Sequence, residues 1–421
     1  MKSDATRITF DPANLFSRVI LQQGRVSLDA DHNEQVEILL HYVRTLARDL
    51  IGPFGGPQGG GFEVDVQKGR LVLTPGRYYV DGILVENPET CAYDEQPMYP
   101  LPDDDPLKLL TGDSPQQRFW LYLDVWERHV SWIEEPAIRE VALGGPDTCT
   151  RSKVVWQLKA LPSDATGDNF PCTDGLGGLV TLSPGALEAR LDDGPAADDP
   201  CVMPPEVRYR GTENQLYRVE IHRGGTQEDN PAFKWSRDNG SVATAIESVA
   251  GDTIEVTHTR GFAAGDWVEL SDDELDLQGR PGVLVPLARV ENGTLVTEPG
   301  AIEEPERWAH ADRHPKVRRW DQTANEDVVL DDGAVPVQMG DWMDLEDGVQ
   351  VRFATGEYRT GDYWLIPARL DGSLEWPEGE ELPPRGIEHH YAPLGFVDTD
   401  GKDMTSARVC RTDIGPASTD T

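Results

Sequence analysis

The stretch Phe16–Pro53, FSRVILQQGRVSLDADHNEQVEILLHYVRTLARDLIGP, decides the N-terminal architecture of this chain. After a short apolar run and a glycine turn, apolar residues recur every three or four positions, which is typical of an amphipathic helix. Asp31, with Glu34 three positions later, fits a capping box at the helix start, and Gly52-Pro53 fits its end. The pattern predicts a helix over 32–50 with one apolar face that needs a partner. That face consists of Val36, Leu39, Leu40, Val43, Leu46, Ala47 and Leu50.

Beyond this helix the pattern is mainly β. Short alternating or apolar runs are separated by Gly, Pro and Asp turns, so we expect a multi-domain chain with several small antiparallel sandwich or barrel modules. A length of 421 residues also exceeds what one core usually serves. The expected parts are an anchor over 1–53, a Gly/Pro linker over 54–61, a β domain over 62–160, an acidic Pro/Gly-rich excursion over 161–213, a small barrel or sandwich over 214–301 and a C-terminal β module over 302–421.

Two local patterns refine this outline. The run 119–126 is apolar on both faces, as in a central strand, and Asp124 within it needs a buried partner, for which Arg128 and Arg139 are candidates. Inside the excursion, Ser183 as a cap and the following proline predict a short helix over 184–191.

The charge is strongly negative. The 75 acidic and 38 basic residues give a formal charge of −37, and the basic residues comprise only 8 Lys against 30 Arg. This composition is typical of proteins from salt-accumulating halophiles, in which salt screens the self-repulsion, and also of acidic proteins from high-GC genomes. Nucleic acid is excluded as an expected partner, because its phosphates are repelled by such a surface.

Cysteine usage and hydropathy restrict the setting. The five cysteines lack a C-x-x-C pair, so isolated reduced thiols are expected, with a Cys172–Cys201 bridge as the alternative. No apolar run reaches about eighteen residues, which argues against direct membrane insertion. The first ten residues lack the apolar core of a signal peptide, so synthesis in the cytoplasm is expected.

A search for catalytic motifs yields little. G-x-S-x-G, H-E-x-x-H and paired His/Cys motifs are absent from the sequence, and the expectation is a non-enzymatic protein without a cofactor. Neighbouring His389 and His390 point to opposite faces of a strand, which favours packing over chelation. Lys234 to Gly240, KWSRDNG, reads as a hairpin rather than a binding site.

Two patterns suggest metal sites. His310 and His314, four residues apart, share a face if they lie on a helix. Asp398, Asp400 and Asp403 are spaced as oxygen ligands for Ca²⁺, although an EF-hand requires a later glycine and a glutamate at position twelve. A polar turn is the competing interpretation of the aspartate loop.

The block that starts the chain resembles the start of a family encoded among phage-tail-like contractile injection system genes of bacteria and archaea. Long words carry this resemblance over nearly the whole chain: 16–35, 78–82 (YYVDG), 123–128 (LDVWER), 139–147, 233–237 (FKWSR), 358–367 and 386–394 (GIEHHYAPL). His32 departs from the pattern, since the matching phrase D-A-D-W-N-E-Q has Trp there.

The resemblance implies a structural component of a contractile tail-like particle, at its baseplate, tail fibre or other peripheral region. Its expected partners are other subunits of the particle, reached through the helix, and further copies of itself, three by analogy with fibres. Assembly in the cytoplasm and release by lysis would follow. The alternative is a particle-associated protein that binds or degrades envelope carbohydrate with the Trp-rich strands around Trp120 and Trp126.

Overall fold

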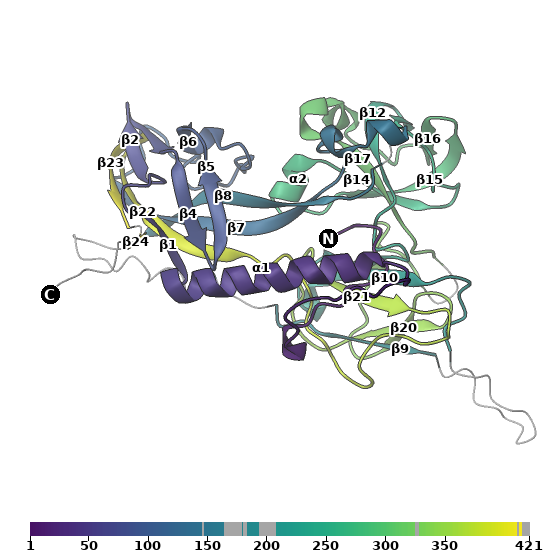
Figure 1. Ribbon diagram of the computed structural model, residues 1–421. Coiled ribbons are helices and arrows are strands. Elements are labelled where there is room, and N and C mark those ends of the chain that lie inside the picture. Colours follow the sequence, from purple (N-terminus) through teal and green to yellow (C-terminus); the bar gives the residue numbers. More distant parts are fainter. Residues whose placement is uncertain are drawn as a thin grey trace, which may run out of the picture. The chain divides into compact units, whose positions relative to one another are not determined.

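The computed structural model describes residues 1–144, 147–163, 179, 183–192, 208–324, 328–410 and 412–414. The fold is mainly β with one long helix, as the sequence predicts (Figure 1). Over the described ranges, no helix has the length and apolarity needed to cross a membrane. The chain forms two compact units: unit 1 comprises 1–8, 129–151 and 183–387, and unit 2 comprises 9–128, 152–182 and 388–421.

Helix α1, Asp29–Ile51, is the long helix and belongs to unit 2. It begins before the expected cap: Leu28 occupies the N-cap position without a side-chain hydrogen bond, so the predicted capping box at Asp31 is wrong. Asp31 lies instead in the first turn, where its charge stabilises the positive end of the helix dipole. The predicted end is confirmed, because Gly52 caps the helix at a φ of 91° and donates its N–H to the Arg48 carbonyl.

Three sheets belong to unit 2. The first, in the order β24-β1-β4-β5, consists of β24 (Asp413–Ile414), β1 (Phe54–Pro57), β4 (Gly76–Val80) and β5 (Ile83–Asn87). The second consists of β2 (Val64–Gln67), β3 (Arg70–Leu73) and β6 (Cys91–Ala92). The third, in the order β23-β22-β7-β8, consists of β23 (Asp403–Val409), β22 (His390–Asp400), β7 (Gln117–Val130) and β8 (Arg151–Ser163).

These strands differ from the expected outline in one place. Residues 54–61, expected as a flexible linker, contain β1, which pairs antiparallel with β4 and parallel with β24. The glycines serve close packing here, since a Cβ on Gly55 would lie 2.9 Å from the Ile51 side chain. The central strand predicted at 119–126 is confirmed as part of β7, whose side chains are buried on both faces.

Unit 1 contains two open sheets and a barrel. The first sheet consists of β18 (Val335–Pro336), β11 (Ala232–Ser236), β10 (Gln215–Arg223) and β21 (Tyr363–Ala368). The second consists of β19 (Trp342–Asp344), β20 (Val349–Phe353) and β9 (Leu187–Leu191). The closed barrel consists of β12 (Ala243–Ala250), β13 (Thr253–Val256), β16 (Thr294–Thr297), β15 (Val283–Glu291), β14 (Trp267–Ser271) and β17 (Lys316–Trp320).

Short helices complete the described chain. They are α2 (Asp273–Leu277) and the 3-10 turns η1 (Pro12–Asn14), η2 (Tyr93–Glu95), η3 (Pro136–Ile138), η4 (Val141–Leu143), η6 (Gln227–Asp229), η7 (Pro305–Ala309) and η8 (Ala311–Arg313). The helix predicted at 184–191 is wrong. Leu187 and Ala189 are buried on one face of β9, which pairs with β20. The alternation of buried residues typical of a strand therefore outweighs the helix-cap residues that precede it.

Strand pairing also redistributes the expected domains. The barrel spans 243–320, whereas β10 and β11, expected within the same module, form an open sheet. The C-terminal segment 302–421 is divided: β21 pairs with β10 in unit 1, and β22 pairs with β7 in unit 2. The Asn239-Gly240 turn has positive φ at both residues, but the strands on its two sides join different sheets, so the predicted hairpin is wrong.

The cysteines follow the tertiary structure rather than their spacing. Cys91 and Cys149 are free thiols, in agreement with the expectation. Cys410 is disulfide-bonded, so the expectation of reduced thiols is wrong for this residue. The alternative bridge between Cys172 and Cys201 falls on residues outside those that the structure describes.

Candidate functional site: an anchored helix with an exposed apolar stripe

Helix α1 is fixed to unit 2 by ion pairs on one of its sides. Arg44 Nη1 lies 2.9 Å from Glu127 Oε2 on β7, and Arg48 Nε lies 3.5 Å from Asp81 Oδ1 in the β4–β5 turn. Burial opposes ionisation of Glu127, yet the hydrogen bond and charge of Arg44 together with the Ser152 hydrogen bond outweigh it, and the pKa of this carboxyl is lowered. The helix is therefore joined to β7 by a charge-assisted contact at Arg44 and to the β4–β5 turn by a longer, more exposed ion pair at Arg48.

The β4–β5 turn approaches the helix backbone closely. Gly82 has a φ of 81°, and a Cβ built on it would lie 2.3 Å from the Arg44 carbonyl oxygen. Glycine is thus required at position 82 for two reasons: the backbone is left-handed, and a side chain would overlap α1.

The N-terminal arm, residues 9–28, contains η1, leads to the helix start and binds the first half of α1. Thr9 Oγ1 donates to Glu34 at 2.6 Å, and the Val19 N–H donates to the Gln35 side chain at 2.9 Å. The arm leaves large apolar side chains exposed: Leu15, Phe16, Ile20, Leu21, Val26 and Leu28. It therefore contacts α1 through these polar groups and through the Phe10 ring, which lies 5.7 Å from the His41 ring, and leaves most of its large apolar groups in solvent.

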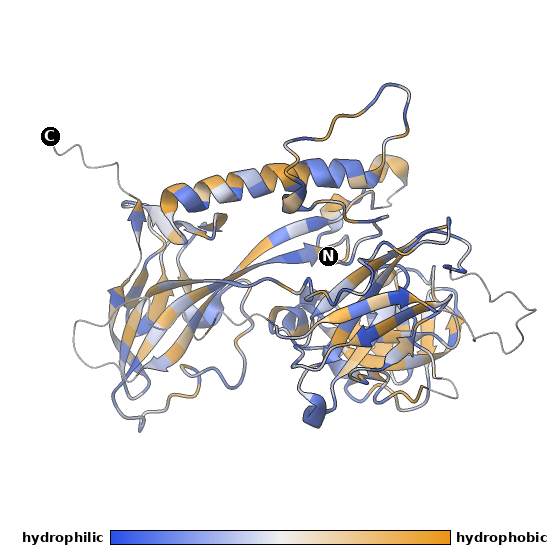
Figure 2. Ribbon diagram, turned by 90° about the horizontal axis from the view of Figure 1, so that it is seen from below, coloured by the Kyte–Doolittle hydropathy of each residue, from blue (hydrophilic) through white to orange (hydrophobic). Residues whose placement is uncertain are grey.

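The apolar stripe, defined as the seven residues predicted from the helical spacing, faces solvent. At 100° per residue it lies on the other side of α1 from Ala30, Arg44 and Arg48. Apolar and polar residues accordingly alternate along α1 in Figure 2. Five of its members are strongly exposed and two, Leu40 and Ala47, are partly buried; the exposed fractions are Val36 54%, Leu39 53%, Val43 56%, Leu46 45% and Leu50 76%.

The two histidines of the HHY word each bind a carboxylate. His389 Nδ1 lies 2.6 Å from Asp124 Oδ1, and the other carboxylate oxygen lies 2.7 Å from Lys159 Nζ. Burial opposes ionisation of Asp124, but these two contacts outweigh it and lower its pKa. The partners of Asp124 are thus His389 and Lys159, and the expected partners Arg128 and Arg139 are wrong, because strand pairing across β22, β7 and β8 selects the neighbours.

His390 serves the helix anchor. Its Nδ1 lies 2.9 Å from Asp81 Oδ2, while Arg48 approaches the other oxygen. The hydrogen bond from His390 is the main cause of the lowered pKa of Asp81. The words YYVDG, LDVWER and HHY, widely separated in sequence, therefore meet beneath α1 and support it.

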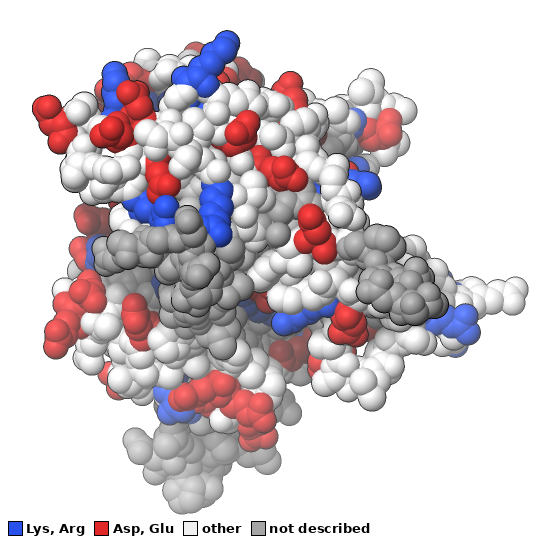
Figure 3. Space-filling model, turned by 90° about the vertical axis from the view of Figure 1, so that its left-hand side faces the viewer, with Lys and Arg blue, Asp and Glu red and all other residues white. Residues whose placement is uncertain are grey.

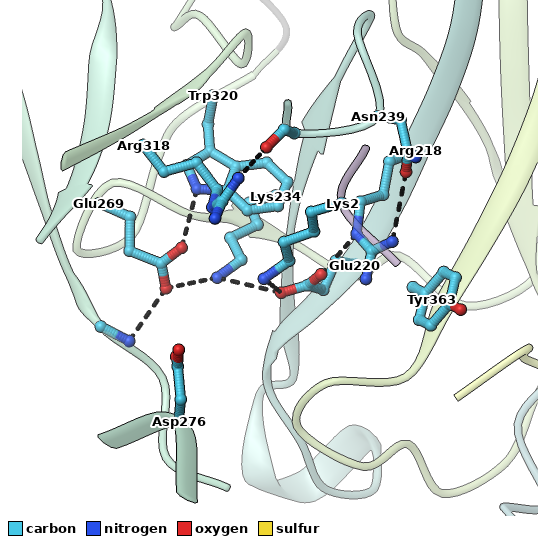
Figure 4. Close-up of polar contacts among 12 residues, drawn as sticks. Lys2, Arg218, Glu220, Lys234, Asn239, Glu269, Asp276, Arg318, Trp320 and Tyr363 are labelled. Atoms are coloured by element: carbon cyan, nitrogen blue, oxygen red, sulfur yellow. Dashed lines mark hydrogen bonds and ion pairs between the residues drawn. The ribbon is translucent and has the colours of Figure 1, made fainter. Parts of the chain in front are cut away.

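Unit 1 holds a second polar cluster, the buried charge network, which joins the N-terminal segment to β10, β11, β14 and β17 (Figure 4). Glu220 lies 2.6 Å from Arg218 Nε and 3.0 Å from Lys2 Nζ. Lys234 Nζ lies 2.5 Å from Glu269 and 3.3 Å from Glu220.

Every carboxylate of this network is satisfied. Glu269 also accepts the Trp320 indole N–H at 2.9 Å and the Gly282 N–H at 2.9 Å. Burial opposes its ionisation, but Lys234 and Lys2 outweigh this effect and lower the pKa of Glu269 to about 2. Lys234 of the KWSRDNG segment is thus a buried structural cation. This agrees with the expectation that the segment is structural and not a binding site.

The histidines proposed as a metal pair do not converge. His314 Nδ1 lies 2.7 Å from Asp273 Oδ2, and His310 caps η8 at an exposed position. Within the described ranges, metal-ligand geometry is found at Glu134, Asp273 and Asp276. The ammonium of Lys316 already lies 2.8 Å from Glu134 and 2.6 Å from Asp276, so a protein cation occupies this position.

The aspartate loop is a hairpin turn. Asp400 and Asp403 are register partners at the β22–β23 turn, and Asp398 binds Arg118 at 2.6 and 3.0 Å. The structure does not gather the carboxylates of Asp398, Asp400 and Asp403 into a group with metal-ligand geometry. The polar turn is therefore the better description of this loop.

Sequence reasoning found the stripe but missed its supports. The relevant signal was present, since Arg44 and Arg48 are four residues apart on the side of the helix away from the stripe. Their partners, Asp81 and Glu127, could not be identified, because they come from distant strands.

Comparison with known proteins gives one match. No curated protein and no solved structure is similar to the chain at a significant level. The sequence profile described as "Family of unknown function (DUF6519)" matches residues 1–171 and 179–418. The chain therefore belongs to the DUF6519 family.

Proposed function

We propose that this chain is a non-enzymatic structural subunit of a larger protein assembly, to which it docks through the apolar stripe of α1. The resemblance in the sequence further leads us to propose that this assembly is a contractile phage-tail-like particle. The chain would occupy its baseplate, a tail fibre or another peripheral region.

The exposure of the stripe carries this proposal. Five Val and Leu side chains in continuous helical register lie between 45% and 76% exposed, and contiguous apolar surface of this kind marks protein interaction sites. The opposite side of α1 is ionically fixed to β7 and to the β4–β5 turn. A helix of this type presents a preformed apolar surface at little conformational cost on binding.

The polar constellations support a structural assignment. Asp124 and His389 form the pair that most resembles part of a catalytic triad, but among the described residues His389 has no further hydrogen-bond partner that could act as a nucleophile. The other oxygen of Asp124 is bound by Lys159, and the buried charge network of unit 1 is internally paired.

The test is a double variant, Leu39→Asp with Val43→Asp, expressed in the source cells. We expect the variant to be absent from purified particles, because the two new carboxylates cannot be desolvated in an apolar interface without a large cost in free energy. The matched control is Val141→Asp with Leu143→Asp, which changes two exposed apolar residues of η4 by the same charge. Unchanged circular dichroism establishes folding, and normal incorporation of the stripe variant refutes the proposal.

A second candidate is carbohydrate binding. Trp120 and Trp126, expected to serve it, are each 3% exposed and cannot stack on a sugar without rearrangement. A cavity of about 260 Å³ in unit 1 is the observation that favours this function, since Trp364, Trp376 and Arg385 are among its lining residues. It ranks second because ligand pockets usually measure about 300–1,000 Å³. Binding of envelope polysaccharide that Trp376→Ala abolishes would support it.

A further inference from the structure

We propose that the partner of the apolar stripe is a second copy of this chain, with the two α1 helices parallel in a short two-stranded coiled coil. This inference rests on the proposed function, because it names the occupant of the same surface. It differs from the three copies expected by analogy with fibres.

The heptad register of the stripe is the first observation. Val36, Val43 and Leu50 are spaced by seven residues and occupy the a position, and Leu39 and Leu46 occupy the d position. Two of the three a residues are β-branched, and β-branched residues at a with Leu at d favour two parallel strands over three or four. This heptad register covers the part of α1 whose a and d side chains are exposed, so that these side chains can pack between those of a second helix.

The residues beside the seam are the second observation. Positions e and g are Leu40, Tyr42 and Ala47 through the middle of the helix, so the seam and its flanks are uncharged from Val36 to Ala47. The chain as a whole carries a formal charge of −37, and carboxylates are spread over the face shown in Figure 3. Apart from Asp49, a g residue beside Leu50, two copies that meet through α1 bring no like charges together along the seam, and a basic partner protein finds little negative charge there to bind.

The end of the seam specifies the orientation. His32 occupies the d position before Leu39, and it is exposed and bound to Ser27 at 2.9 Å. In a parallel pair the two His32 side chains face one another as a polar layer, which fixes register at the cost of some stability. In an antiparallel pair centred on Val43, His32 would lie beyond Leu50 of the other helix and outside the seam.

Anchoring explains how so short a seam can suffice. Free coiled coils of two heptads are marginal, because helix formation must accompany association. Here α1 is already folded and held by Arg44 and Arg48. The conformational entropy of forming the helix is therefore already lost when each copy folds, and association needs only to bury the apolar stripe.

Disulfide trapping of the full chain tests the geometry. In a Cys149→Ser background, which removes the exposed thiol, Leu46→Cys should give a disulfide-linked dimer on mild oxidation, since d residues face their own counterparts in a parallel pair. Thr45→Cys, an exposed neighbour at position c, is the control and should give no disulfide-linked dimer. Leu39→Cys mixed with differently tagged Leu46→Cys should give no heterodimer; a heterodimer indicates an antiparallel pair and overturns the proposal.

Sedimentation of the unmodified chain tests the association itself. We expect twice the monomer mass, and a larger dimer fraction as NaCl rises, because the Debye length falls from about 10 Å at 0.1 M to about 3 Å at 1 M and screens the net repulsion. A monomer at every concentration overturns the proposal. If the unmodified chain is a monomer and the Leu39→Asp/Val43→Asp variant still fails to enter particles, only the proposal that the partner is a second copy is overturned. If the unmodified chain is a dimer and the same variant enters particles normally, only the proposed function is overturned.

Discussion

Arg44 of α1 binds Glu127 of β7 at 2.9 Å while its own carbonyl oxygen faces Gly82 of the β4–β5 turn. One residue of the helix therefore meets a strand of one sheet and a turn of another. Because Arg44 lies on the side of α1 away from the apolar stripe, this contact determines which face of the helix is presented to a partner.

The first prediction concerns this ion pair. Arg44→Ala should lower the free energy of unfolding by about 0.5–1 kcal/mol, the range for partly exposed pairs, because each side chain is more than a quarter exposed. Glu127→Gln should cost a similar amount, and the double variant should cost less than the sum. Denaturant unfolding of the four proteins measures the coupling; additive losses would show that the two side chains do not interact.

The second prediction concerns Gly82. Gly82→Ala should destabilise unit 2 by about 2 kcal/mol or more, because a left-handed backbone and overlap with the Arg44 carbonyl add together. Gly69→Ala is the matched control, since Gly69 has a φ of 77° but nothing within 4 Å of its Cβ position. The control should cost only about 1–2 kcal/mol. Equal losses of melting temperature would contradict the close approach of turn and helix.

The third prediction concerns Lys234, which is 2% exposed between two carboxylates. Lys234→Met should cost about 3–5 kcal/mol, because it leaves Glu220 and Glu269 buried with fewer cations. Adding Glu269→Gln should recover part of this loss, since one uncompensated charge is then removed. Scanning calorimetry of the full chain measures both effects, and a double variant less stable than Lys234→Met alone would argue against the network.

The fourth prediction concerns acid sensitivity. Burial, assisted by Lys234, lowers the pKa of His222 from 6.5 to about 4. The unfolded chain binds more protons between these values, so the stability of unit 1 should fall as the pH falls from about 6.5 to 4. His222→Gln should flatten this part of the profile by an amount on the order of 1–3 kcal/mol. An unchanged slope would show that His222 is not desolvated.

The elements readable from sequence are those specified by local periodicity. The spacing from Val36 to Leu50 predicts α1 and its stripe, and the apolar run 119–126 predicts the central part of β7, because each pattern repeats with the period of its own element. The start of α1 is harder to predict, since Asp31 has a side chain suited to the N-cap but Leu28 occupies that position.

The supports of the candidate site could not be predicted, because tertiary pairing determines them. Asp124 obtains His389 from the residue before β22 and Lys159 from β8, whereas the sequence directs attention to nearby arginines. The helix expected at β9 is wrong for a related reason: Ser183 and Pro184 resemble a helix start, but pairing with β20 fixes the segment as extended.

The pairing of β7 with β22 has a consequence for biosynthesis. Asp124 and His389 are separated by 265 positions, so β7 leaves the ribosome long before its neighbour exists. At about 5–20 residues per second the delay is roughly 13–50 s, during which an apolar strand edge is unpaired. Unit 2 therefore cannot complete this sheet until residues 388–400 have been made, after the whole of unit 1, which ends at residue 387.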